Sequence, residues 1–242
     1  MKKLLMLAFL INTTLLEGCT KEDRTETIET EMGVVKGRVS DSKGNGMPNV
    51  KVVIENTVYY ASYVHAFTDA NGYYKTKVPQ GSWHASAMIE RNFLDKTYRF
   101  DLSPDSDDSF AGTEGAVRNF TWKLTGAKPY GGFYGSDVAV YGQPGVIYDA
   151  ADVELTLTPD GPLIDGSTGT SITKKLIDIG GGEDGIRDVA IGKYTITARN
   201  TTTNKPMQIR LRNTGVYGSS VTTLFKSGFT GLTNYQIVVQ VQ

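Results

Sequence analysis

The residues able to perform chemistry in this chain are few, and their types restrict what it could catalyse. The 242 residues include one cysteine, Cys19, and two histidines, His65 and His84. A single cysteine excludes an internal disulfide framework and a cysteine-based zinc site. Two histidines need carboxylate ligands to complete a catalytic zinc site, and neither has a carboxylate at a suitable local spacing. We therefore expect no metal ion and no other cofactor.

Motifs for nucleophilic catalysis and for phosphate binding are missing from the sequence. No Gly-x-Ser-x-Gly segment occurs, and the glycines of Gly180-Gly181-Gly182 are not followed by the lysine of a phosphate-binding loop. Acid–base catalysis by two carboxylates stays open in principle, because the sequence alone does not pair them. The sequence favours a protein that is not an enzyme.

Two acidic segments, residues 101–109 and 182–188, have the oxygen-rich composition that calcium prefers. Neither matches the twelve-residue loop of a helix–loop–helix calcium site. We interpret both as solvated turns, with calcium binding as the alternative.

Loop aromatics are the best candidates for ligand binding, because sugar rings stack on exposed aromatic faces. Trp83 and Tyr73 are predicted to be core residues instead; Trp83 shares its strand face with Ala85 and Ala87. In the segment 129–135, glycines leave the aromatic rings uncovered. These rings either bind a ligand or seal the two domains together. The candidates form two groups: Tyr59, Tyr60 and Tyr63, and then Tyr130, Phe133 and Tyr134.

The elements that position these residues are predicted to be β-strands, because the composition of the chain is typical of β-structure. Gly (27) and Tyr (13) are abundant, and no stretch beyond the N-terminus shows a convincing helical period. Lysine and arginine (25) nearly balance aspartate and glutamate (26), so no basic excess indicates a nucleic-acid partner. The sequence predicts an all-β chain of two tandem β-sandwiches.

The first predicted sandwich spans residues 33–125. Short alternating segments separated by turn residues are typical of sandwich strands. The expected strands are 34–39, 50–54, 65–68, 73–78 and 82–89, and residues 120–124 close the domain.

This region resembles the carboxypeptidase regulatory-like domain. The resemblance rests on Gly37-Arg38-Val39-Ser40-Asp41, Gly46-Met47-Pro48-Asn49-Val50, Val52-Val53-Ile54, Thr68-Asp69-Ala70-Asn71-Gly72-Tyr73-Tyr74 and Val78-Pro79-Gln80-Gly81-Ser82-Trp83. It implies a seven-stranded, prealbumin-like sandwich of the carbohydrate-binding-like kind. It does not imply an enzyme, because the peptidase domain is missing and neither histidine has a glutamate three residues later.

The second predicted sandwich, residues 126–242, repeats the first faintly. Segment 189–198 shares its valine, glycine, aromatic residue and final alanine with segment 78–87, at an offset of 111 residues. This favours a second prealbumin- or immunoglobulin-like sandwich. Its expected strands are 137–141, 152–158, 171–179, 185–189, 193–200, 207–212, 221–226 and 235–241.

The N-terminus has the features of a secretion signal. Lys2-Lys3 precedes the apolar run 4–11, which is too short to span a membrane. Leu15-Leu16-Glu17-Gly18-Cys19 resembles the lipobox of bacterial lipoproteins, although Glu17 stands where a small residue is usual. The resemblance implies a signal peptide of residues 1–18 and acylation of Cys19. Residues 19–32 then form an acidic, flexible tether.

Lys21-Glu22-Asp23, directly after Cys19-Thr20, resembles the export signal of Bacteroidetes surface lipoproteins. That would place the protein on the outer face of the outer membrane. The alternative is a linker that is merely charged.

These expectations combine into a non-enzymatic, lipid-anchored outer-membrane protein that binds or displays a partner at the cell surface. The partners would be the outer membrane, through the acyl anchor, and a glycan or surface protein. The alternative is an accessory subunit of an envelope, transporter or adhesin assembly. An exposed hydrophobic surface would favour the accessory subunit, and an aromatic groove would favour glycans.

Overall fold

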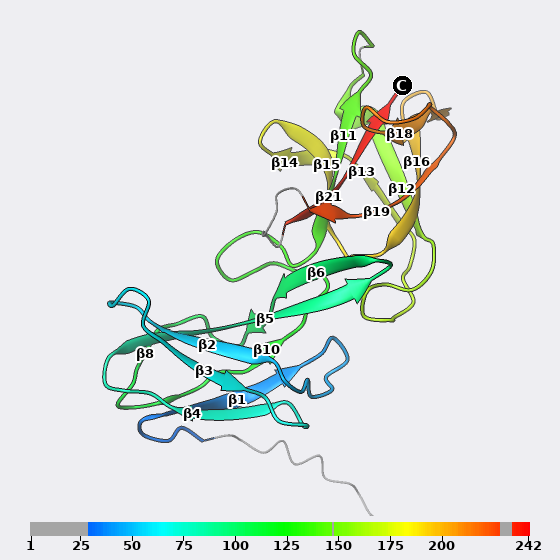
Figure 1. Ribbon diagram of the computed structural model, residues 1–242. Helices are drawn as coiled ribbons and strands as arrows, with labels where there is room; N and C mark the ends of the chain where they lie inside the picture. Colours follow the sequence, from blue (N-terminus) through cyan, green and yellow to red (C-terminus); the bar gives the residue numbers. More distant parts are fainter. Residues whose placement is uncertain (1–28, 147, 228–233) are drawn as a thin grey trace, which may run out of the picture.

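The computed structural model describes residues 29–146, 148–227 and 234–242 (Figure 1). Within them nearly all regular structure is β-strand, and the helical structure described there is one 3-10 turn at Ala150–Asp152. The strands form four sheets, which are arranged as two tandem β-sandwiches. The prediction of an all-β chain of two sandwiches is confirmed.

The first sandwich is made of residues between Val34 and Thr121. One sheet has the order β4 (Tyr73–Lys77), β1 (Val34–Ser40), β10 (Phe120–Thr121), β7 (Ser103–Pro104), and β9 (Ala116–Val117) also pairs with β1. The other has the order β3 (Tyr63–Phe67), β2 (Lys51–Asn56), β5 (Ser82–Phe93), β6 (Lys96–Asp101), and β8 (Phe110–Ala111) also pairs with β5.

The core of this sandwich follows the alternation of its strands. Trp83 and its face-sharing alanines are buried, as predicted, and Trp83 Nε1 donates a hydrogen bond to the carbonyl of Pro79 (2.9 Å). Burying the indole with its N–H bonded avoids the cost of an unsatisfied donor.

The prediction that Tyr73 lies in the core is wrong: its neighbour Tyr74 is buried, whereas Tyr73 is 40% exposed. Tyr74 lies opposite Gly37 in the β1–β4 pairing and donates to the carbonyl of Arg118. A Cβ at Gly37 would lie 1.9 Å from that carbonyl oxygen, so only glycine allows this close approach.

The long hairpin β5–β6 reaches from the first sandwich to the second (Figure 1). Its two-residue tip, Leu94-Asp95, has positive φ at both positions, as a tight hairpin turn requires. Tyr98 of β6 packs edge-on against Tyr235, with ring centroids 4.9 Å apart, and donates a hydrogen bond to the carbonyl of Phe225 (3.0 Å). The hairpin therefore joins the two cores.

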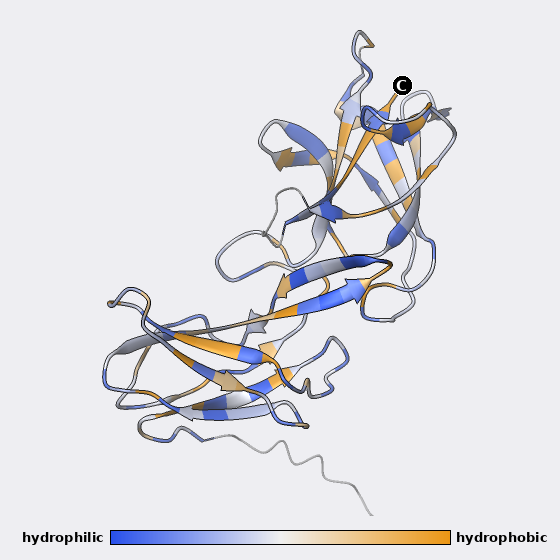
Figure 2. Cartoon of the chain, in the orientation of Figure 1, coloured by the Kyte–Doolittle hydropathy of each residue, from blue (hydrophilic) through white to orange (hydrophobic). Residues whose placement is uncertain are grey.

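The second sandwich also has two sheets. The first has the order β14 (Ile177–Gly180), β15 (Glu183–Val189), β11 (Ser136–Gly142), β21 (Tyr235–Val241), β18 (Ile209–Leu211), with β20 (Lys226–Ser227) also on β21. The second has the order β13 (Ile172–Lys175), β12 (Val153–Pro159), β16 (Lys193–Asn200), β17 (Lys205–Met207), with β19 (Val221–Leu224) also on β16. Figure 2 shows apolar residues along β21 here, as along β2 in the first sandwich.

Three segments predicted as single strands are each two short strands that belong to opposite sheets. Strands β13 and β14 are separated by Leu176, β17 and β18 by Gln208, and β19 and β20 by Phe225. Leu176 and Phe225 are buried where the chain crosses between the sheets. Such corners close the ends of a sandwich.

The faint repeat has a structural counterpart. Strands β5 and β16 begin at the matched positions Ser82 and Lys193. Tyr194, like Trp83, is buried and donates a hydrogen bond to the carbonyl four residues before it, that of Ala190 (3.0 Å). The two sandwiches thus fill the same position with an aromatic ring whose polar atom is bonded in the same way.

Candidate functional site

The candidate site of the first sandwich lies on the outer face of the sheet formed by β3, β2 and β5. Side chains alternate across these strands, so every second residue points away from the core. The strand register places Tyr63 and His84 on either side of Glu55, and His65 and Ser86 on either side of Val53. The outward residues of the three strands are Tyr63, His65 and Phe67; Lys51, Val53 and Glu55; and His84, Ser86 and Met88.

One column of this face, on the edge strand β3, is aromatic. The rings of Tyr63 and His65 lie nearly parallel, at 11°, with centroids 6.3 Å apart. Tyr63 and Phe67 are 50% and 63% exposed. Three neighbouring exposed rings form a contiguous patch, unlike a single exposed side chain, so this column is a candidate binding surface.

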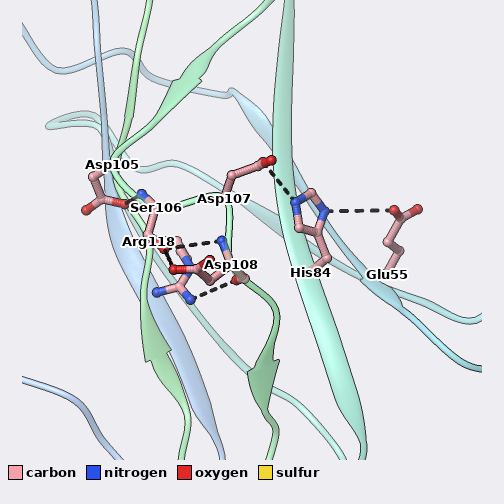
Figure 3. A network of polar contacts seen from close by, with 7 residues as sticks. All are labelled: Glu55, His84, Asp105, Ser106, Asp107, Asp108 and Arg118. Carbon is pink, nitrogen blue, oxygen red and sulfur yellow. Dashed lines mark hydrogen bonds and ion pairs between the residues drawn. The ribbon is translucent and has the colours of Figure 1, made fainter. Parts of the chain in front are cut away.

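The opposite column centres on His84, which lies between two carboxylates (Figure 3). Its Nε2 is 3.0 Å from Oδ1 of Asp107, and its Nδ1 is 3.8 Å from Oε1 of Glu55. Within the described part of the chain, no hydroxyl or thiol forms a hydrogen bond with His84. The two carboxylate contacts fix the imidazole and present polar groups beside the sheet face.

Asp107 is held in place by a loop with its own hydrogen bonds. Asn119 donates through its side-chain amide to Asp105 (2.7 Å), and Arg118 donates to the carbonyl of Asp108 (2.9 Å). Ser106 also bonds Asp108, as Figure 3 shows. The loop is thus positioned before any ligand binds, which reduces the entropy cost of binding.

The acidic segments that the sequence singled out are used for internal contacts. Asp105 bonds Asn119 and Asp107 contacts His84, while Asp188 of the second segment accepts from the backbone N–H groups of Gly126 and Gly135. Across residues 29–146, 148–227 and 234–242, no group of three or more His, Cys, Asp or Glu side chains is placed to hold a metal ion.

A groove of about 450 Å³ lies between the sheet face and this loop. Such a volume falls in the range of small-molecule sites. Its lining is more apolar than polar, with Lys51, His84 and Asp107 among the polar residues, and such a mixture suits a ring with one apolar face and hydroxyls at its edge. Lining residues include Lys51, Val53, His84, Ser86, Met88, Asp107 and Tyr130.

Tyr130 at the rim belongs to a hairpin that joins the two sandwiches. Gly131 and Gly132, both with positive φ, form its turn. Lys128 pairs with Asp101 of the first sandwich at 2.9 Å, whereas Asp188 of the second holds both ends of the hairpin. Partial burial and the nearby Asp101 carboxylate raise the pKa of Tyr130 to about 12.

Tyr130 also lines a second cavity of about 390 Å³, on the side of the second sandwich. Phe133 lies in it with Arg187 over its ring at 5.7 Å. Asp137 lines the same cavity; burial raises its pKa, and Arg187 opposes that shift.

The structure thus divides the six predicted aromatic residues. Tyr63 lies on the sheet face, Tyr130 at the rim of both cavities, and Phe133 in the second cavity. Tyr134 is 7% exposed, packed near the ammonium groups of Lys123 and Lys128, so it contributes to the junction and not to a surface. Tyr59 and Tyr60 lie beyond the face, in an exposed loop.

The sequence analysis did not name His84, His65 or Phe67 as candidates for ligand binding, and it considered Asp107 only within the acidic segment 101–109. For His65 and Phe67 the signal was present, because the expected strand 65–68 places both on one face. The contact of His84 with Asp107 joins residues in different elements, and no local pattern reveals it.

The predicted lipidation and export residues, Cys19, Lys21, Glu22 and Asp23, lie outside the described residues. In the part of the chain that is described, no helix has the length and apolar character needed to cross a membrane.

No protein-family model and no curated protein matches the sequence. Among solved structures, the TIE protein of Bacillus anthracis is similar over 87% of this chain, at 12% identity and a TM-score of 0.36. The chain spans about a third (34%) of that protein's length.

Two further similarities cover most of the other protein. A DUF3823 family protein from Parabacteroides merdae matches over 80% of this chain and 99% of its own, at 8% identity and a TM-score of 0.26. A Pseudomonas aeruginosa protein, provisionally described as carbohydrate binding, matches over 39% and 92%, at 16% identity and a TM-score of 0.22. Adhesins and pilins are among the other similar structures. At these scores the similarities assign neither a family nor a function to this chain.

Proposed function

We propose that the protein is a non-enzymatic, lipid-anchored protein of the bacterial outer-membrane surface, and that it binds a saccharide on the outer face of β3, β2 and β5. The observation that carries the binding proposal is the pairing, on one face, of the exposed rings of Tyr63 and Phe67 with the polar cluster of Glu55, His84 and Asp107.

The arrangement suits a saccharide for physical reasons. A sugar presents apolar C–H faces that stack on aromatic rings and hydroxyls that exchange hydrogen bonds with carboxylates and imidazoles. The groove of about 450 Å³ on the β5 side of this face is lined by His84, Asp107 and Tyr130, and the rings of Tyr63 and Phe67 lie across β2 from it, on β3. Lys51, which lines the groove, adds a donor that suits a saccharide carrying acidic groups.

The direct experiment is a glycan array probed with the mature protein purified in detergent. The proposal expects binding to a restricted set of glycans. Absence of binding to every glycan on the array, by a protein that remains folded, would contradict the saccharide assignment.

The anchor is tested separately by Cys19→Ala, which should release the protein from membranes because the lipobox is lost. Replacing Lys21-Glu22-Asp23 by alanines should keep the protein in the membrane but reduce its access to protease in whole cells. A Cys19→Ala protein that still pellets with outer membranes after a salt wash contradicts the anchor. Unchanged surface labelling of the triple variant contradicts the export signal.

The accessory-subunit function is the second candidate, and exposed apolar side chains favour it. Tyr63, Phe67 and Met88 are each about half exposed or more on one side of the first sandwich, and a flat partner surface would cover them well. A photo-crosslinking residue at position 67 distinguishes the two functions in cells. One defined cross-linked protein, together with a blank glycan array, would favour the assembly role.

A further inference from the structure

The loop between β2 and β3 exposes three large apolar side chains in a row. Val58, Tyr59 and Tyr60 are 72%, 70% and 99% exposed. The whole stretch from Asn56 to Val64 carries no charged residue. Consecutive apolar residues on a loop tip are costly in water and indicate a surface that meets another phase or partner.

This loop is held in shape by hydrogen bonds and not by burial. The side-chain oxygen of Asn56 accepts from the backbone N–H groups of Val58 and Tyr59, both at 2.9 Å. Thr57 Oγ1 donates to Ser82 Oγ at 2.7 Å, and Asn56 N donates to the carbonyl of Ser62. The tip is therefore presented outward in a defined conformation.

The N-terminal segment enters the first sandwich at the same end as this tip. The connection can be followed through neighbours: Ser82 pairs with Ala111, Gly112 bonds Gly81, and Gly115 packs against the carbonyl of Glu31. In Figure 1 the start of β1 and the β2–β3 loop lie at the same end of the first sandwich, on its two opposite sheets. Met32, two residues before the start of β1, is itself 83% exposed.

A lipid anchor at Cys19 would hold this end close to the bilayer. Twelve residues separate Cys19 from Met32, and even fully extended they reach only roughly 40 Å. Tyrosine is favoured at the membrane interface, where its ring enters the apolar boundary and its hydroxyl stays hydrated.

We propose that this end of the first sandwich rests on the lipid bilayer, with Met32, Val58, Tyr59 and Tyr60 entering its interfacial region. The proposal rests on the lipid anchor of the proposed function but not on saccharide binding. It gives Tyr59 and Tyr60 a role separate from Tyr63, and it turns the second sandwich, at the far end of the first, away from the membrane.

The test uses the full-length lipidated protein in vesicles of phosphatidylethanolamine and phosphatidylglycerol with brominated acyl chains, which quench nearby tryptophan. Tyr60→Trp places the probe at the tip, and Val216→Trp places a matched probe at a 90% exposed position of the second sandwich. The native Trp83 and Trp122 are buried and provide a common background.

The proposal expects loss of the added Tyr60→Trp fluorescence in brominated vesicles and none for Val216→Trp. Equal quenching of the two probes, or quenching of neither in protein that floats with the vesicles, overturns the bilayer contact while leaving the anchor intact. Protein that does not float contradicts the anchor, and the bilayer contact with it.

Discussion

Single aromatic side chains decide how each sandwich is filled, and Trp83 and Tyr194 occupy equivalent places in the two cores. Trp83→Ala should lower the free energy of unfolding by roughly 3–5 kcal/mol, because a large buried ring leaves a cavity. Tyr194→Phe keeps the ring and removes one hydrogen bond, so it should cost about 0.5–1.5 kcal/mol. Urea unfolding measures both values. A Trp83→Ala protein of unchanged stability that lost ligand binding would make Trp83 a binding residue.

At the same scale, alternation from the sequence located Trp83 correctly but not Tyr73. Two adjacent tyrosines follow Gly72, and only the β1–β4 register, with the space left by Gly37, decides that Tyr74 is the buried one. The groove residues show the same limit. Glu55 and His84 meet through cross-strand pairing, and Asp107 joins them through a loop. Such meetings depend on the tertiary fold and not on local spacing.

At the scale of elements, strand positions follow from alternation, but sheet membership does not. Leu176 and Phe225 continue the apolar pattern while the chain passes from one sheet to the other, so one alternating run conceals two strands. Strand β6 was missed because its turn, Leu94-Asp95, lacks the glycine that usually marks a two-residue hairpin.

The β5–β6 hairpin should couple the unfolding of the two sandwiches. Tyr98 donates to the carbonyl of Phe225, and Tyr235 accepts from the backbone N–H of Arg99, so each joins the sandwiches through a hydroxyl. We expect one calorimetric unfolding peak for the wild type, and a broadened or split peak for Tyr98→Phe with Tyr235→Phe.

Tyr194→Phe is the matched control for this coupling, because it removes a hydroxyl bond of the same kind inside the second sandwich. It should lower the melting temperature without splitting the peak. A wild-type protein that unfolds in two separate calorimetric peaks would contradict the coupling between the sandwiches.

At the scale of the whole molecule, a polar contact also joins the two sandwiches. Ser42 of the first donates to the carboxylate of Asp165 in the second (2.6 Å), and Lys43 donates to the carbonyl of Asp165 (3.3 Å). Burial raises the pKa of Asp165, whereas hydrogen bonds from Ser167 and Ser42 lower it. The hydrogen bonds outweigh burial, so the pKa of Asp165 lies below the ordinary 3.8.

Because the folded pKa of Asp165 is the lower one, its contribution to stability is present above pH 3.8 and is lost as the pH falls through the folded value. Asp165→Asn should therefore melt below the wild type near pH 7, and the difference should shrink as the pH drops under about 4. A difference that is constant with pH would contradict the role given to the Asp165 carboxylate.

The central claim, saccharide binding on the outer face of β3, β2 and β5, is tested most directly by titrating the strongest array ligand into matched variants. Tyr63→Ala with Phe67→Ala removes the exposed rings of β3, whereas Tyr73→Ala removes a partly exposed tyrosine from the opposite sheet. Aromatic stacking of this kind contributes about 0.5–1.5 kcal/mol per ring beyond area burial. We predict that the double variant loses roughly tenfold or more in affinity at unchanged melting temperature, and that Tyr73→Ala binds like the wild type. Equal affinity of all three proteins would contradict the claim.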